Sequence, residues 1–160
     1  MMKDLLKESD DYKLLLVGPI HDKGKCQELV KKMNMENNVL FLGWRSDIVE
    51  LLSIGDIYVA SSVREGLGLN LIEAQYCGLP VIASNNRGHN EIIKDGFNGY
   101  LVKHNDFEKF KDKVKYITEN NDICDQIIEN ANKTSLKFSQ EEALKNIKKL
   151  YMFCLLKQNI

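Results

Sequence analysis

Two carboxylates stand on either side of a glycine-containing turn. Glu65 directly precedes Gly66, and Glu73 follows eight positions after Glu65, beyond Gly68 and inside a run with helical features. Glycines before a helix let the backbone approach a ligand, and the unpaired amides at the helix start favour an anion, usually phosphate. Carboxylates only accept hydrogen bonds, so two of them beside a phosphate site suit the hydroxyls of a ribose and a hexose. The alternative is a plain tight turn followed by a solvated carboxylate.

Apolar residues surround Glu73 in the sequence. Its neighbours are Leu69, Leu71, Ile72 and Ala74. A helix of this composition is predicted to be buried on most sides, and a buried charge requires a partner. We therefore expect another group to hold the Glu73 carboxylate.

Short apolar runs alternate with amphipathic stretches along the chain. Strands are predicted at 13–17, 39–42, 57–60, 81–83 and 100–102. Helices are predicted at 25–33, 47–54 and 69–77, and three longer ones at 106–120, 122–137 and 141–157. Near-continuously apolar strands separated by helices indicate a parallel sheet that is covered on both faces. The expected fold is α/β, with a Rossmann-like doubly wound parallel sheet followed by C-terminal helices, in a single domain over 1–160.

Two pairs of residues have the spacing of a helix capping box. They are Asp47 with Glu50 and Ser139 with Glu142. In each pair the first side chain is expected to accept a hydrogen bond from the amide three residues later, and the glutamate to reach back.

Composition restricts the classes of function. The chain has 160 residues, with 22 Lys and Arg against 23 Asp and Glu and a formal charge of -1. Nucleic-acid binders need a basic surplus, which this chain lacks. The longest apolar runs are far shorter than the ~20 residues of a membrane helix, and no signal peptide is recognisable, so a cytoplasmic protein is expected. The 4 cysteines and 3 histidines have no metal-ligand spacing, so no metal site is expected.

The turn and its surroundings resemble a known family. Residues 65–74, followed by 77–83, are similar to the E-x7-E signature of retaining glycosyltransferases of family 4, the group 1 enzymes with the GT-B fold. Further similarity lies at 39–43 with Asp47, and at 88–102, in the same order as in the family. The resemblance covers roughly 12–155, and it points to the C-terminal, donor-binding domain of such an enzyme.

The resemblance implies a role for each matching residue. Glu73 would hold the ribose hydroxyls of a nucleotide-sugar donor, and Glu65, as the catalytic residue, would lie at the transferred sugar. Trp44 would flank the base or pack against the protein, and Arg64 is a candidate counter-charge. The expected donor site comprises Gly43, Trp44, Arg45, Gly66, Leu67, Gly68, Leu69 and Glu73. The acceptor side would include Arg87 and His89.

The same resemblance implies the reaction. It is the retaining transfer of a hexose from a nucleotide-diphosphate sugar, expected to be a UDP-sugar, without a cofactor or an essential metal. The acceptor would be a saccharide or a lipid-linked saccharide, in the synthesis of capsule, exopolysaccharide or another cell-surface glycan. The protein would be cytoplasmic, or peripheral at the inner face of the membrane.

The sequence also departs from the family pattern. Complete enzymes have an N-terminal domain that supplies the acceptor site, and their second domain opens with a strand and a basic loop, neither of which is recognisable here. We therefore expect a sheet without its first strand, a chain that is inactive alone, and pairing of two chains through an exposed sheet edge. The alternative is a non-catalytic Rossmann-like remnant or interaction subunit that has lost its ligand. A nicotinamide-binding domain is disfavoured, because no G-x-G-x-x-G follows the first predicted strand.

Overall fold

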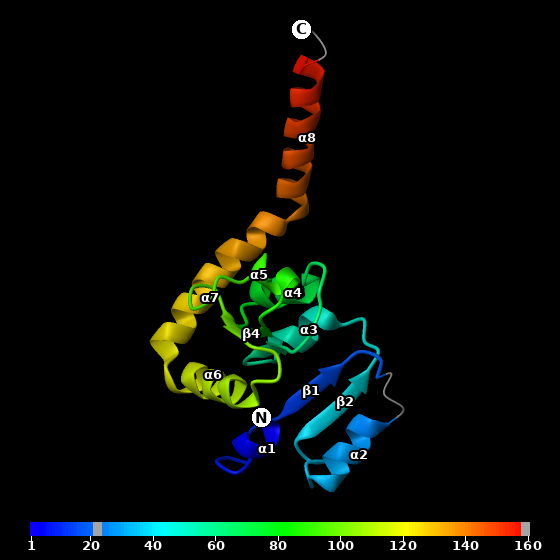
Figure 1. Cartoon of the computed structure of the whole chain (residues 1–160), viewed down its shortest axis with the longest axis vertical. Helices are drawn as coiled ribbons and strands as arrows, with labels where there is room; N and C mark the ends of the chain where they lie inside the picture. The colour runs from blue at the N-terminus through cyan, green and yellow to red at the C-terminus, as the bar shows by residue number, and fades with distance from the viewer. Residues whose placement is uncertain (21–23, 158–160) are drawn as a thin grey trace.

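Five parallel strands form the centre of the computed structural model, which describes residues 1–20 and 24–157 (Figure 1). One sheet pairs β1 (Leu14–Val17) with β2 (Val39–Gly43). The other has the order β3-β4-β5, formed by Tyr58–Ala60, Val81–Ser84 and Tyr100–Val102. All five predicted strands are confirmed, and so is the α/β class with parallel pairing.

The expected single sheet is divided into these two hydrogen-bonded parts. Within the described residues, β1 pairs with β2 alone and β3 pairs with β4 alone, so each has one edge without a strand partner. The expected absence of a first strand stays a prediction.

Helix α1 (Met2–Leu5) joins the two parts through its side chains. Leu5 is 2% exposed and packs with Ile82 and Phe110 in the core beside β4 and β5. On the other side of the same segment, Met2 and Leu6 pack against the core of the β1-β2 sheet. Apolar packing by α1 thus takes the place of backbone pairing between the two sheets.

The remaining helices, apart from the last, connect and cover the strands (Figure 1). Their bounds are α2 Lys25–Lys32, α3 Ile48–Ser53, α4 Leu69–Tyr76, α5 Arg87–Asn90, α6 Phe107–Glu119, α7 Asn121–Ser135 and α8 Gln140–Lys157, with a 3-10 turn at Leu136–Phe138. The predicted helix over 122–137 therefore ends early and continues as the 3-10 turn. Helix α5 was not predicted, because four residues are too few to show helical periodicity.

Strand β4 is the buried centre of the larger sheet, with all four residues enclosed. Val81 and Ala83 pack into the same core as Leu71 of α4. Ile82 belongs to a second core, with Phe110 of α6. This alternation places helices on opposite faces of the sheet, as expected for a doubly wound fold.

One predicted capping box is wrong and the other is half formed. The Asp47 side chain makes no cap hydrogen bond and instead pairs with Arg45, whose Nε donates to Oδ1 at 2.7 Å. A guanidinium can donate two hydrogen bonds to a carboxylate, whereas a backbone amide donates one, so the carboxylate binds the arginine. At the start of α8, the Ser139 hydroxyl accepts from the Glu142 amide at 3.3 Å, but the Glu142 carboxylate binds Lys145.

Helix α8 projects away from the rest of the molecule (Figure 1). Its large apolar side chains Leu144, Ile147, Leu150, Tyr151, Phe153 and Leu155 are each at least half exposed. Across the described part of the chain, no helix is both long enough and apolar enough to cross a membrane.

Asn98 is the polar centre of the connection from α5 to β5. It is 1% exposed, and its Nδ2 donates to the Ile92 carbonyl at 2.9 Å while its Oδ1 accepts from the Lys94 amide at 2.7 Å. Its carbonyl accepts from Nε2 of the buried Gln75 of α4 at 2.9 Å. These bonds fix the end of α4 to the segment that enters β5.

We expect Asn98→Ala to lower the free energy of unfolding by about 2–4 kcal/mol, because it leaves the buried Ile92 carbonyl and the Lys94 amide without their partner. Urea denaturation followed by circular dichroism measures this. The matched control is Asn146→Ala on the exposed side of α8, which should change stability by less than about 0.5 kcal/mol. A loss below about 1 kcal/mol for Asn98→Ala would contradict the role given to these bonds.

Candidate functional site

The loop from β3 to α4 presents unpaired backbone donors. Gly68 is the N-cap of α4 and has no side-chain cap. The amides of Gly66, Leu67 and Gly68 donate to no other described residue, whereas the Gly68 carbonyl accepts from the Leu71 amide at 2.9 Å. Free amides at a helix start, together with the helix dipole, attract anions. The predicted glycine turn is therefore present, with three amides that no described residue uses, of which those of Gly66 and Leu67 belong to exposed residues.

Two hydrogen bonds hold the start of this loop against the end of β4. The Ser62 carbonyl accepts from Nδ2 of Asn86 at 2.9 Å and from the Ser84 hydroxyl. Asn86 also caps α5, where its Oδ1 accepts from the His89 amide at 3.0 Å. The loop and α5 are thereby fixed to the same point.

A close backbone contact fixes the middle of the loop. A Cβ added to Gly88 would lie 2.5 Å from the carbonyl oxygen of Glu65, so only glycine fits there without displacement of the loop. A Cβ at Gly66 would meet nothing within 4 Å. Gly88 was noticed in the sequence only as part of the family pattern, and the structure supplies its physical reason.

Glu65 and Glu73 both lie near Tyr58, a residue that the sequence reasoning did not single out. Burial raises the pKa of the Tyr58 phenol, and the negative charges of Glu73 and Glu65 raise it further, while a hydrogen bond from Asn70 opposes the rise. That bond joins Nδ2 of Asn70 to the Tyr58 hydroxyl at 3.0 Å. The two carboxylates of the motif thus share one neighbourhood. Tyrosine is common in strands, so nothing in the sequence indicated that Tyr58 lies at the candidate site.

The expectation that Glu73 is buried and held by a partner is wrong. Glu73 is exposed and forms no hydrogen bond or ion pair with another described side chain. Leu71 and Ala74 are fully buried, but Leu69 on the same helix is 61% exposed. Helix α4 is therefore buried along one side only, and Glu73 is free to meet a ligand.

The predicted base site lies at the carboxyl end of β2, in the other sheet. Gly43 has a positive φ of 63°, and Trp44 is 82% exposed, so the indole does not pack in the core. Hydrogen bonds from Arg45 lower the pKa of the Asp47 carboxyl. Among the described residues, no hydrogen bond or ion pair joins this segment to the 61–68 loop.

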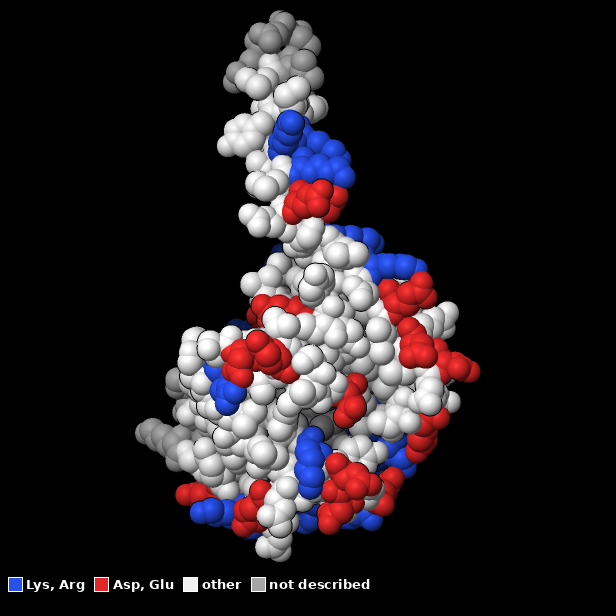
Figure 2. All heavy atoms as spheres, turned by 180° about the vertical axis from the view of Figure 1, so that it is seen from behind, with Lys and Arg blue, Asp and Glu red and all other residues white. Residues whose placement is uncertain are grey.

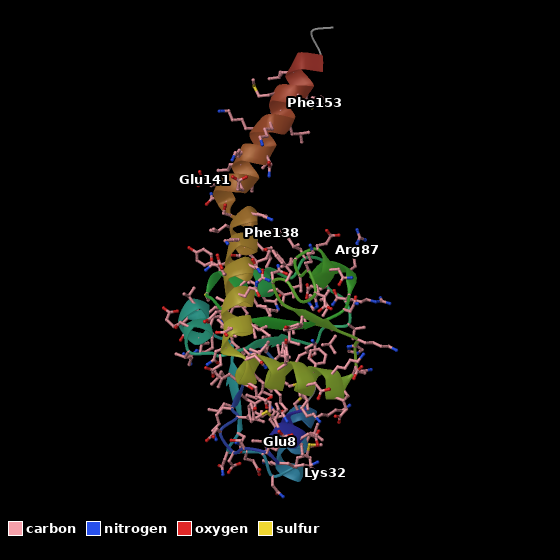
Figure 3. All side chains as sticks on the ribbon, turned by 90° about the vertical axis from the view of Figure 1, so that its left-hand side faces the viewer. Glu8, Lys32, Arg87, Phe138, Glu141 and Phe153 are labelled. Atoms are coloured by element: carbon pink, nitrogen blue, oxygen red, sulfur yellow. The ribbon has the colours of Figure 1, made fainter. Side chains whose placement is uncertain are left out.

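The two residues expected on the acceptor side are placed differently. Arg87 is exposed and lies at the outside of the body (Figure 3). His89 is fully buried, with Nδ1 at 2.7 Å from the Ser84 carbonyl. Arg87 is accessible to a ligand, whereas the His89 ring is enclosed beneath the loop.

No group of three or more His, Cys, Asp and Glu side chains that could hold a metal ion occurs within 1–20 and 24–157. The site thus consists of backbone donors and carboxylate acceptors. Amides can bind phosphate, and carboxylates can bind sugar hydroxyls.

Comparison with known proteins identifies a family and relatives of this chain. Residues 1–134 match the family model of glycosyl transferases group 1. The chain is 36% identical over 148 residues to the putative glycosyltransferase EpsD of Bacillus subtilis, covering 92% of this chain and 39% of that protein. It is 35% identical over 120 residues to an Escherichia coli enzyme, UDP-Gal:alpha-D-GlcNAc-diphosphoundecaprenol alpha-1,3-galactosyltransferase, covering 75% and 31%.

The fold also matches solved structures. Anabaena Alr3699/HepE in complex with UDP superposes with a TM-score of 0.84 at 26% identity, over 94% of this chain and 43% of that one. The present chain therefore spans about two fifths of the length of EpsD and of HepE. The family match, the shared sequence and the GT-B architecture lead to one conclusion: the chain belongs to the group 1 glycosyltransferases.

Proposed function

We propose that this chain is the donor-binding domain, over 1–160, of a retaining glycosyltransferase that uses a nucleotide-diphosphate sugar, and that the donor is a UDP-sugar. The observation that carries the proposal is that Glu65 and Glu73 are both near enough to Tyr58 for their charges to raise its pKa, with three amides between them in the chain that no described residue uses. Two relatives support the choice of nucleotide: one solved structure holds UDP, and the E. coli enzyme is named for UDP-Gal.

In this proposal each part of the site has a separate task. The amides of Gly66, Leu67 and Gly68, with the dipole of α4, stabilise the diphosphate as charge develops on it during departure. Glu73 binds the ribose hydroxyls, and Glu65 binds hydroxyls of the hexose. Such charge stabilisation by oriented amides requires neither a cofactor nor a metal ion.

The acceptor is proposed to bind elsewhere, with Arg87 at the edge of its site. We propose a saccharide or lipid-linked saccharide acceptor in the synthesis of capsule, exopolysaccharide or another cell-surface glycan. The E. coli relative, named for a diphosphoundecaprenol-linked acceptor, supports this class. Because the chain spans about two fifths of the length of its relatives, we propose that it binds the donor and that transfer requires a further, acceptor-binding domain.

The first test is binding of UDP and UDP-glucose, in comparison with GDP-glucose, by calorimetry and NMR at up to millimolar ligand. We expect UDP and UDP-glucose to bind weakly, Glu73→Ala to weaken both by at least about 10-fold, in line with loss of hydrogen bonds to a charged group, and EDTA to have no effect. Lys148→Ala on α8 is the control and should bind as the unaltered chain does. Absence of binding at millimolar ligand would instead indicate a remnant that has lost its ligand.

A second copy of the chain is the proposed partner of the exposed sheet edge. Edge strands with unpaired backbone groups tend to pair with another strand, and β1 has such an edge along residues that are only partly buried. Light scattering on the purified chain is expected to give twice the monomer mass. A mass of 18.4 kDa at micromolar concentration would contradict pairing.

Helix α8 supports a location at the inner face of the membrane. Figure 2 shows basic side chains gathered on one side of the projecting helix, beside uncharged ones. Lys145, Lys148 and Lys149 are exposed, and so are Leu150 and Tyr151. We propose that these lysines bind an anionic lipid surface, with the neighbouring apolar side chains against it.

We expect the full chain to sediment with vesicles that contain phosphatidylglycerol and not with pure phosphatidylcholine. Each lysine contributes about 1 kcal/mol near such a surface, so changing Lys145, Lys148 and Lys149 together to Glu should weaken binding by at least about 100-fold. The matched control makes the same change at the exposed lysines of α2, Lys25, Lys31 and Lys32. Equal sedimentation with both lipids would contradict the proposal.

A further inference from the structure

The buried ring of His89 has a defined protonation pattern. Nδ1 lies 2.7 Å from the Ser84 carbonyl oxygen, which can only accept a hydrogen bond. Nδ1 therefore carries the proton in the neutral ring, and Nε2 is left as a lone-pair acceptor. The longer contacts of Nδ1, to Asn86 Nδ2 at 3.0 Å and to Ser84 Oγ at 3.4 Å, do not alter this assignment.

The Nε2 acceptor has no donor. It is completely buried, and no described residue makes a hydrogen bond to it. Buried polar atoms in folded proteins are nearly always paired, so an unpaired one requires an explanation. The neighbouring atom of the ring, Cδ2, is close to the loop, since a Cβ added to Gly68 would lie 3.3 Å from it. The unpaired side of the ring is therefore next to the loop that carries the free amides.

The sugar end of the site lies on the same side. Gly88, which directly precedes His89, contacts the backbone of Glu65. Glu65 is the carboxylate assigned to the hexose, whereas Glu73 is assigned to the ribose. A Cβ added to Gly66 would meet nothing within 4 Å, so the loop faces open space at that residue. Because Nε2 is completely buried, the loop must shift before a ligand atom can reach it.

We propose that Nε2 of His89 accepts a hydrogen bond from a hydroxyl of the transferred hexose, which makes His89 a specificity-determining residue for the sugar. This inference rests on the proposed function. A lone pair repels phosphate oxygens and requires a donor, and the hexose hydroxyls are the donors nearest to the diphosphate. The backbone amides then bind the diphosphate of the ligand, and the His89 ring binds its sugar.

The test uses the full chain labelled with 15N-histidine. The chain has 3 histidines, and loss of one signal in His89→Asn identifies the resonance. We expect the free chain to show the Nδ1-protonated form. We also expect UDP-glucose to shift the Nε2 resonance in the direction of an accepted hydrogen bond, and UDP alone to leave it unchanged.

The His89→Asn variant also distinguishes loss of a hydrogen bond to the sugar from a general disturbance of the fold. An asparagine amide can donate to the Ser84 carbonyl in place of Nδ1 but offers nothing at the Nε2 position. We expect His89→Asn to bind UDP within about twofold of the unaltered chain and to bind UDP-glucose about 10-fold more weakly, as for loss of one hydrogen bond. His104→Asn, after the end of β5, is the control for both ligands.

Three results would overturn the proposal. They are equal weakening of UDP and UDP-glucose binding in His89→Asn, an Nε2 shift caused by UDP alone, and an Nε2 resonance unmoved by bound UDP-glucose. In each case the unaltered chain still binds UDP, so the proposed function stands. Failure of the unaltered chain to bind either ligand would overturn both proposals.

Discussion

The carbonyl oxygen of Ser62 is the point on which the site depends. It accepts hydrogen bonds from Ser84 and Asn86, and so ties the chain leaving β3 to the chain leaving β4. Adjacent parallel strands bring their carboxyl ends to one edge of the sheet, but they do not fix how the following loops lie. The two hydrogen bonds do so, and the contact of Gly88 with Glu65 completes the placement. The amides before α4 stay unpaired because the loop is held by other groups.

Because the strands form two separate sheets, different parts of the candidate site are held by different hydrophobic cores. The loop 61–68 and α5 belong to the three-stranded part, whose central strand is fully buried. Trp44 and Arg45 belong to the two-stranded part, which is joined to the first through the apolar side chains of α1. The proposed phosphate and sugar region therefore rests on a continuous core, whereas the proposed base region depends on packing between two cores.

The charge of the site follows from its construction. Glu65 and Glu73 bring negative charge to a place that is otherwise suited to an anion, and Arg64 is the one basic residue within the 61–68 loop. Oriented amides are fixed dipoles that need no reorganisation when a ligand binds. They can attract a diphosphate while the carboxylates stay free for hydroxyls. Any larger positive charge that the diphosphate needs would have to come from another segment or partner.

Local sequence determined the elements of this protein. The five strands were predictable because apolar runs of three to five residues between turn residues are too short for typical helices. The E-x7-E spacing also placed two carboxylates around a glycine turn at a helix start. Helix α5 was not predictable, because four residues are too few to show a helical period. The predicted cap at Asp47 was wrong, because the guanidinium of Arg45 offers the carboxylate two hydrogen-bond donors and a backbone amide offers one.

Only the tertiary structure decided how these elements meet. The exposure of Glu73, the role of Tyr58 and the enclosure of His89 depend on contacts between segments far apart in the chain. The spacing of residues along a helix shows which side chains share a face, but it does not show which face packs against the rest of the protein. The glycine at 88 illustrates the difference. The sequence shows that a glycine is there, and the structure shows why no side chain fits, since an added Cβ would lie 2.5 Å from the carbonyl oxygen of Glu65.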